Sequence, residues 1–171
     1  MEQTPTSHVV KGLIISLILI IISIVSYFLD LSMDSWVQYL SYAIFIAGVI
    51  ASCIVYGKQH GGHVTFGNTF AHGFKVSSVV AVLMVVFVLL FALIFPEMKD
   101  KALIAIQESM SKNPAVTQDM IDSTMTMYTK WFTPIMIASA IFGYLFVGLI
   151  ASLIGAAVTK KNPNPTPQVN V

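Results

Sequence analysis

Residues 76–95 read VSSVVAVLMVVFVLLFALIF and contain no Asp, Glu, Lys, Arg or His. A helix of about 20 apolar residues is long enough to cross the roughly 30 Å hydrocarbon core of a bilayer. Because lipid offers no hydrogen-bond partner to the backbone, such a segment must satisfy its own N–H and C=O groups as a helix. The stretch therefore predicts a transmembrane helix, and with it an integral membrane protein.

Three further stretches without ionisable side chains are long enough to span a bilayer, so we predict spans over residues 12–29, 36–57, 76–95 and 133–158. Leu13–Ile22 (LIISLILIII) does not alternate polar and apolar residues as a strand of a membrane barrel would. The first stretch is longer than the core of a cleavable signal peptide, and no small-residue cleavage site follows it. The predicted fold is all-α, a single membrane domain over residues 1–171 with four transmembrane helices.

The composition excludes several functional classes. Only 10% of the 171 residues are charged, against roughly a quarter in soluble domains, and the formal net charge of +1 provides no basic surface for nucleic acid. A single cysteine, Cys53, excludes an internal disulfide. The sequence contains no H-E-x-x-H motif, phosphate-binding loop or G-x-S-x-G elbow, and the apolar stretches contain no ionisable residue. We therefore expect no enzyme activity and no cofactor.

The distribution of lysines predicts the orientation. With four spans, the N-terminus, the loop 58–75 and the tail share one side, which holds five lysines and one acid, a net charge of +4. The other side holds four lysines and seven acids, a net charge of −3. Lysine-rich flanks of short loops face the cytoplasm, so both termini and the loop 58–75 are expected to be cytoplasmic. The proline-punctuated tail, 160–171, is expected to be disordered.

Residues 96–132 form the largest polar segment, and Asn113-Pro114 divides it into two arms of nearly equal length. Each arm has apolar residues at helical spacing. Asn113 is suited to cap the second arm, with Pro114 at its first helical position. We expect the third and fourth spans to continue as an outer helical hairpin that projects about 25 Å beyond the bilayer. The alternative is an unstructured outer loop.

Several residues predict details of this hairpin. Two pairs of opposite charge have the i,i+4 spacing that stabilises a helix, namely Glu97 with Lys101 and Glu108 with Lys112. Pro96 and Pro134 lie where the arms would enter the bilayer, and we expect both to cause bends. The methionines between Met110 and Met127 are expected to form the seam between the arms; binding of a partner or of a soft metal is the alternative.

The loop 58–75 contains His60, His63 and His72, and His8 lies on the same predicted side. Imidazole is a common zinc ligand and titrates near neutral pH. However, two glycines separate His60 from His63, and the loop contains no carboxylate that would act as a further ligand. We therefore predict solvated histidines without a metal, with a metal or pH-sensing site at His60, His63 and His72 as the alternative.

The same loop predicts where the third helix begins. Phe66, Phe70 and Phe74 recur at a spacing of four residues, which places them on one face of a helix. Thr65 precedes them and is suited to be the N-cap. We expect the third helix to begin near residue 66; a short helix lying in the membrane interface is the alternative.

Small residues at four-residue spacing indicate close helix packing in lipid. They are Ala43, Ala47 and Ala51 in the second span and, in the fourth, Ser139 with Gly143, Gly148 with Ser152 and Ala156, and Ala151 with Gly155. These residues predict that the second and fourth spans pack closely, although the stripe on the fourth is equally compatible with a homodimer face. The first and third spans are rich in Ile, Leu and Val and are expected to contact more lipid. On the first span, Ser16, Ser23 and Ser26 are expected to hydrogen-bond to carbonyls of their own helix.

The pattern Thr65-Phe66-Gly67-x-x-Phe70-x-x-Gly73-x-Lys75 leads into the third span, and Phe95-Pro96 closes it. With four spans and a polar outer segment, the chain resembles an uncharacterised family of small Bacteroidetes membrane proteins, grouped as domain of unknown function 4199. The resemblance covers roughly residues 9–159. It implies a multi-pass protein of the bacterial inner membrane, and it carries no established activity or functional residue.

These observations favour a non-enzymatic membrane protein that acts by association. We expect an oligomer, or an accessory subunit of a larger membrane assembly, that binds through the outer hairpin. Its expected partners are the lipid bilayer and a second copy or another membrane protein, and not nucleic acid. The alternative is a small transporter or channel for an uncharged or metal substrate with the histidine loop at its cytoplasmic end, since pores can be lined by backbone and hydroxyl groups.

Overall fold

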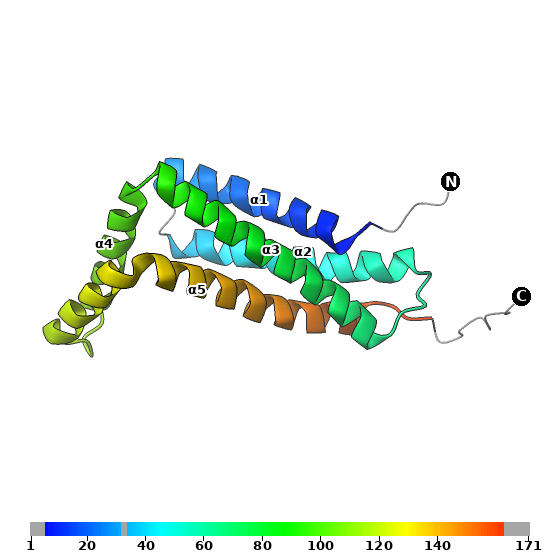
Figure 1. Cartoon of the computed structure of the whole chain (residues 1–171). Helices are drawn as coiled ribbons and strands as arrows, with labels where there is room; N and C mark the ends of the chain where they lie inside the picture. Colours follow the sequence, from blue (N-terminus) through cyan, green and yellow to red (C-terminus); the bar gives the residue numbers. More distant parts are fainter. Residues whose placement is uncertain (1–5, 32–33, 163–171) are drawn as a thin grey trace, which may run out of the picture.

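The computed structural model describes residues 6–31 and 34–162, and all the regular structure in this part of the chain is helical. The helices are α1 (His8–Phe28), α2 (Ser35–Gln59), α3 (Phe66–Ile94), α4 (Glu97–Ser111) and α5 (Gln118–Val158). Four of them, α1, α2, α3 and α5, lie side by side as a bundle, whereas α4 leaves the end of α3 at a steep angle (Figure 1). The prediction of an all-α fold with four helices long and apolar enough to cross a membrane is confirmed.

The helices extend beyond the apolar stretches at the end of the bundle where α1 and α3 begin. Ser7 caps α1 by accepting a hydrogen bond from Val9 N at 3.0 Å. Thr65 caps α3 by accepting one from Asn68 N at 3.1 Å, so the predicted start of the third helix near residue 66 is confirmed. As a result, Lys11 and His72 belong to helices of the bundle rather than to loops.

The core of the bundle consists of apolar side chains from all four of its helices, α1, α2, α3 and α5. Leu19 of α1, Phe45 of α2 and Val80 of α3 are all at most 1% exposed. Many other large apolar side chains point outward, such as Leu17 (59% exposed) and Leu93 (80% exposed). An apolar outer surface of this extent is the kind that a lipid bilayer covers.

Close contact between α3 and α5 depends on small residues in both helices. A Cβ atom at Gly148 of α5 would collide with the side chain of Ser77 in α3. A Cβ at Gly73 of α3 would lie 2.9 Å from Ser152 Oγ in α5. The third span, expected to contact more lipid, is the least buried of the four, yet Gly73 and Ser77 also allow α5 to approach its backbone closely.

Both bends expected at prolines are present. Helix α3 ends at Ile94, and α4 begins only after Pro96. Within α5 the backbone leaves helical geometry at Trp131 (φ −113°, ψ 24°), three residues before Pro134. Pro134 lacks the N–H that would bond to the carbonyl of Lys130, and its ring crowds the preceding turn, which accounts for this bend.

The second arm of the hairpin begins at Gln118, later than expected, because Asn113 stabilises a turn rather than capping a helix. The Asn113 side-chain oxygen accepts a hydrogen bond from Ala115 N, and its carbonyl accepts one from Val116 N, both at 3.0 Å. Asparagine commonly stabilises turns in this way. Thr117 caps α5 instead.

Candidate functional site

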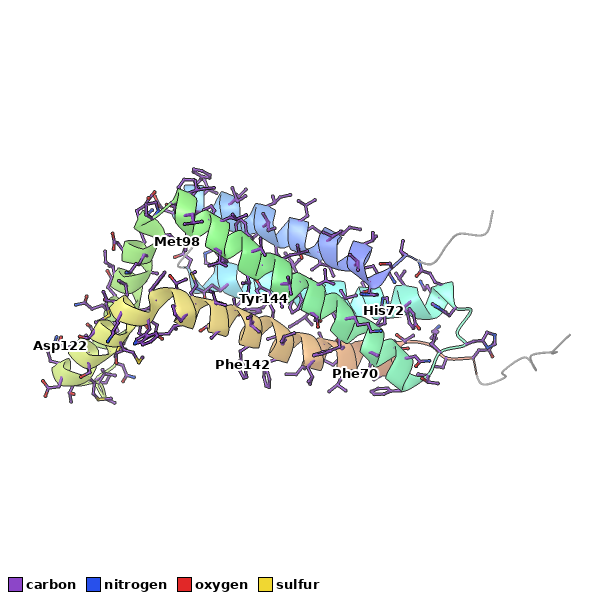
Figure 2. The ribbon with its side chains drawn as sticks, viewed as in Figure 1. Phe70, His72, Met98, Asp122, Phe142 and Tyr144 are labelled. Carbon is purple, nitrogen blue, oxygen red and sulfur yellow. The ribbon has the colours of Figure 1, made fainter. Side chains whose placement is uncertain are left out.

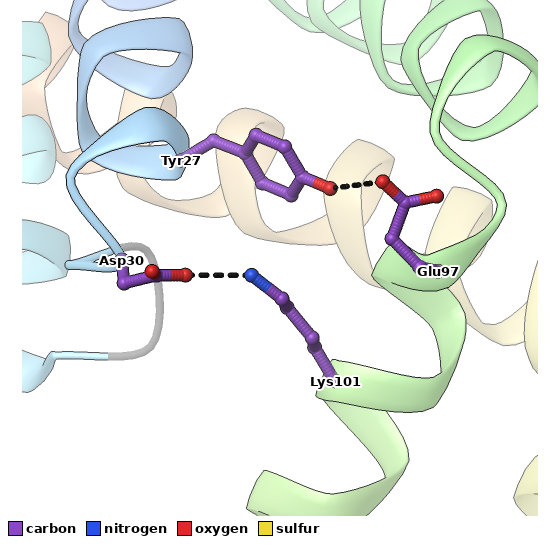
Figure 3. A network of polar contacts seen from close by, with 4 residues as sticks. All are labelled: Tyr27, Asp30, Glu97 and Lys101. Carbon is purple, nitrogen blue, oxygen red and sulfur yellow. Dashed lines mark hydrogen bonds and ion pairs between the residues drawn. The ribbon is translucent and has the colours of Figure 1, made fainter.

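Two polar contacts hold α4 against the corner between α1 and α2 (Figure 3). The Tyr27 hydroxyl donates a hydrogen bond to Glu97 Oε1 at 3.0 Å, and Lys101 Nζ lies 2.6 Å from Asp30 Oδ1. Asp30 has a positive φ of 54°, a conformation that aspartate tolerates better than most residues. The contacts therefore position α4 across the end of the bundle.

These contacts replace one of the two charge pairs expected within α4. Glu97 and Lys101 reach the α1–α2 corner instead of each other. The second expected pair, between Glu108 and Lys112, forms with an N–O distance of 3.9 Å. The hydrogen bond and negative charge of Asp30 favour the ammonium form and raise the pKa of Lys101 above its ordinary value of 10.5. The Lys101 side of the ion pair is therefore charged at neutral pH, and this charge is lost as the pH rises through the raised pKa.

Replacing Asp30 with asparagine should loosen α4 without unfolding the bundle. Exposed ion pairs contribute little free energy, so we expect amide hydrogen exchange in α4 to accelerate by only roughly two- to fourfold relative to the bundle. Asp34→Asn is the control, because the exposed Asp34 side chain makes no capping hydrogen bond to α2. Equal exchange rates of α4 in the two variants would contradict the role of the Asp30–Lys101 ion pair.

The hairpin formed by α4 and residues 118–131 of α5 exposes large apolar side chains. No residue of α4 is buried. Four apolar side chains are about half exposed or more, namely Ile104 (58%), Met120 (53%), Met127 (49%) and Trp131 (53%). The prediction that the methionines form the seam between the arms is wrong for Met120 and Met127, which lie on the outer surface; Ile121, 4% exposed, is buried instead.

A cavity of about 340 Å³ lies beneath α4, at the same end of the bundle. All five helices contribute to its lining, and α4 does so through Met98. None of the described residues that line the cavity carries a charge, but several carry hydroxyl groups, including Ser23, Ser26, Tyr42 and Tyr144. The cavity is therefore polar at a few points and apolar elsewhere, as is typical of small-molecule sites.

At the opposite end of the bundle, Lys11 and His72 are buried side by side. Their exposed fractions are 9% and 8%. Lys11 Nζ lies within hydrogen-bond distance of three acceptors, namely Ser52 O (3.4 Å), Gln59 Oε1 (3.3 Å) and His72 Nε2 (3.2 Å). An ammonium group has three donors, so this cluster satisfies it fully and connects α1 to α2 and α3.

The contact with Lys11 determines the protonation state of His72. An ammonium group has no acceptor, so His72 Nε2 must accept the hydrogen bond and the imidazole is neutral. The Tyr56 ring stacks on the His72 ring, with their centroids 4.3 Å apart and an interplanar angle of 17°. The Nε2 lone pair is thereby occupied and is not available to a metal ion.

The structure does not bring the three histidines of the loop together. His72 lies within α3, whereas His60 Nδ1 lies 2.8 Å from the Tyr56 carbonyl and His63 is exposed in the loop between α2 and α3. Within residues 6–31 and 34–162, no group of three or more His, Cys, Asp or Glu side chains is arranged to hold a metal ion. The geometry therefore offers no metal-ligating set built on these histidines.

The small residues predicted to pack the helices fall into two groups. In α5, Gly148, Ser152 and Gly155 are buried, and Gly143 is half-buried. A Cβ at Gly155 would lie 2.8 Å from Cys53 Sγ of α2, so the α5 stripe faces both α2 and α3. In α2, Ala43, Ala47 and Ala51 lie on the exposed side. The α2 residues that face the core are the larger Phe45, Val49 and Cys53. The small residues of α5 leave room for these side chains.

Sequence patterns did not identify Lys11 as a partner of His72. Lys11 directly precedes the apolar stretch 12–29, where a lysine commonly marks the end of a transmembrane span. One signal for His72 was present in the sequence. Thr69, His72, Val76 and Val80 follow helical spacing, and all four are buried on the same face of α3. This spacing places His72 inside the bundle.

The chain is without a significant match among curated proteins and among solved structures. One family profile matches residues 11–161, a segment that runs from Lys11 in α1 to the residues just after α5. The match includes α4, the hairpin turn and both polar clusters of the bundle. Since it covers most of the chain, the protein belongs to the family described as protein of unknown function (DUF4199).

Proposed function

We propose that this is a multi-pass protein of the bacterial inner membrane, from a member of the Bacteroidetes. In this proposal α1, α2, α3 and residues 133–158 of α5 cross the bilayer. The length and apolar surface of these helices support the spans. The lysine distribution supports cytoplasmic termini, with the hairpin on the outer side. Two parts of the sequence predictions lie outside the described residues. They are Glu2, the one acid counted on the side of the termini, and residues 163–171 of the tail that is expected to be disordered.

Thiol labelling tests this orientation. Cys53 is the only cysteine, so Cys53→Ala provides a background for single cysteines at two exposed positions, Ser123 in the hairpin and His63 in the α2–α3 loop. We expect a membrane-impermeant maleimide to label Ser123→Cys in intact spheroplasts and His63→Cys only after permeabilisation. The reverse pattern would contradict the orientation, and labelling of both in intact spheroplasts would contradict the single span, α3, that separates the two positions.

The hairpin supports a role in association rather than in chemistry. Ile104, Met120, Met127 and Trp131 expose apolar surface on an element that the proposed orientation places in water. Met120, Met127 and Trp131 recur at helical spacing along α5, and exposed apolar side chains that share a helix face are typical of protein-binding surfaces. The Tyr27–Glu97 and Asp30–Lys101 contacts hold this surface in a defined position relative to the bundle. We infer that the protein binds a second copy or another membrane protein through the hairpin, without enzymatic activity or a cofactor.

A substitution on the exposed surface of the hairpin tests this function. A minority of interface residues dominate binding, and truncating one of them costs more than about 1 kcal/mol. With Met127 as such a residue, Met127→Gln should reduce the cross-linked fraction of the protein in native membranes by roughly fivefold or more. Thr129→Gln introduces the same side chain at an exposed position on the opposite face of the same helix and should change little. Mass spectrometry of the cross-linked product distinguishes a second copy from another protein. Equal cross-linking of both variants, or none in the wild type, would contradict association through this surface.

Transport of a metal or uncharged substrate past the histidine loop has less support. Lys11 occupies the Nε2 position of His72 at 3.2 Å. An ammonium group so close would also repel an incoming cation. The exposed hairpin therefore provides the stronger indication of function.

A further inference from the structure

The cavity beneath α4 has the size of a small-molecule site. Its volume of about 340 Å³ falls within the range of about 300–1,000 Å³ that ligand pockets occupy. Its lining runs from Met98 of α4, at the end of the bundle, to Tyr144 of α5, which lies further along the bundle (Figure 2). Tyr27, whose hydroxyl bonds to Glu97, also lines it, so the contact that positions α4 belongs to the wall of this cavity.

Two serines of α1 present unpaired hydroxyl groups to the cavity. Most serines within the bundle donate to the carbonyl four residues earlier, as Ser16 does to Gly12 O at 2.8 Å. By contrast, neither Ser23 nor Ser26 has a side-chain hydrogen bond to any part of the described chain. Ser26 is only 8% exposed, and among the described residues no enclosed polar side-chain atom lacks a partner. The Ser26 hydroxyl must therefore open into the cavity.

Two tyrosines add further donors. The hydroxyl groups of Tyr42 and Tyr144 line the cavity, and neither has a hydrogen-bond partner in the described part of the chain. The Tyr144 ring is held edge-on against Phe45, with their centroids 5.2 Å apart and an interplanar angle of 89°. Free hydroxyl donors in a partly apolar site favour a ligand that carries acceptor oxygens.

The remaining walls restrict the ligand further. Phe87 and Phe91 provide aromatic surface, with their centroids 5.3 Å apart. Aromatic side chains favour stacked or edge-on contacts with a ring. Because the described lining carries no charge, a charged ligand would lose its hydration without gaining an ion pair. The ligand is therefore uncharged.

We propose that this cavity binds an uncharged ring compound with carbonyl oxygens, of the quinone class. The carbonyl oxygens accept hydrogen bonds from hydroxyl groups such as those of Ser26 and Tyr144, and the ring packs against the phenylalanines. The apolar outer surface of the bundle allows a lipid-soluble compound to reach the site from the bilayer. Binding here requires neither the hairpin's partner nor a given orientation of the chain, so it is tested separately from the proposed function.

The test uses the full chain in detergent, with menadione as the probe. Trp131→Phe provides a background in which Trp36, next to the lining residue Val37, is the single tryptophan that reports binding by fluorescence quenching. We expect the quenching of Trp36 fluorescence to saturate as the menadione concentration rises. Ser26→Ala removes one donor and should weaken binding by roughly two- to tenfold. Ser16→Ala, whose hydroxyl is already bonded within its helix, should bind as the parent does.

Two further measurements distinguish the cavity from the micelle. Naphthalene has rings but no oxygens, so it should bind more weakly than menadione and equally to the parent and to Ser26→Ala. Ser23→Leu fills the cavity and should abolish saturable quenching. Quenching that rises linearly and equally in all variants would mean partition into the micelle and would overturn the proposal. Equal affinities for menadione and naphthalene, or saturable binding to Ser23→Leu, would overturn it as well.

Discussion

Replacing Gly148 with leucine is expected to lower the free energy of unfolding by about 3 kcal/mol or more. A Cβ at this position collides with the Cβ and Oγ atoms of Ser77 and lies 3.4 Å from the Phe45 ring. The Cβ of Ser77 is attached directly to the α3 backbone, so the collision is relieved only by separating α3 from α5. Unfolding in mixed micelles of increasing SDS fraction, followed by circular dichroism, measures the effect.

Gly67→Leu is the matched control, because the same side chain is introduced at the start of α3. A Cβ at Gly67 would meet only Thr65 Oγ1, at 4.0 Å. Leucine has the better helix propensity, so we expect no loss and a gain of up to about 0.5 kcal/mol. Gly148→Ala provides a smaller step if the leucine variant does not fold. Equal stabilities of the Gly148 and Gly67 variants would contradict the close α3–α5 contact.

His72→Leu is expected to lower the free energy of unfolding by about 2–3 kcal/mol. The substitution removes one of three acceptors from the buried Lys11 ammonium, and leaving a charged donor unsatisfied costs about 1.5–3 kcal/mol. It also removes the stacking contact with Tyr56. The same SDS titration measures the loss, and His63→Leu, at an exposed loop position, should change stability by less than about 0.5 kcal/mol.

The double variant Lys11→Met, His72→Leu tests whether the pair acts as a unit. Removing both partners in favour of apolar side chains is often nearly neutral, whereas removing one leaves the other buried without compensation. We therefore expect the double variant to regain most of the stability that His72→Leu loses. If the double variant instead loses as much stability as Lys11→Met and His72→Leu lose together, Lys11 and His72 are not coupled.

Features set by short segments could be predicted from the sequence. The four apolar stretches are long enough for bilayer-spanning helices, and each lies within a helix of the bundle except for Leu29 and Phe95, which directly follow α1 and α3. Thr65 caps α3 because its hydroxyl needs only the N–H three residues on. Pro134 bends α5 because it removes a hydrogen bond within its own helix. In each case the interacting groups lie within one turn of each other, so no other helix is involved.

The tertiary structure alone decided which side chains meet. Glu97 and Lys101 have the spacing of a pair within one helix, yet Lys101 bonds to Asp30, which is 71 positions away. Lys11 and His72 are 61 positions apart and meet only because α1 and α3 turn these faces toward each other. The cavity beneath α4 likewise depends on the angle at which α4 crosses the bundle. Helix rotation and crossing angle follow from packing over whole helices, and the mean hydropathy of a single segment does not specify them.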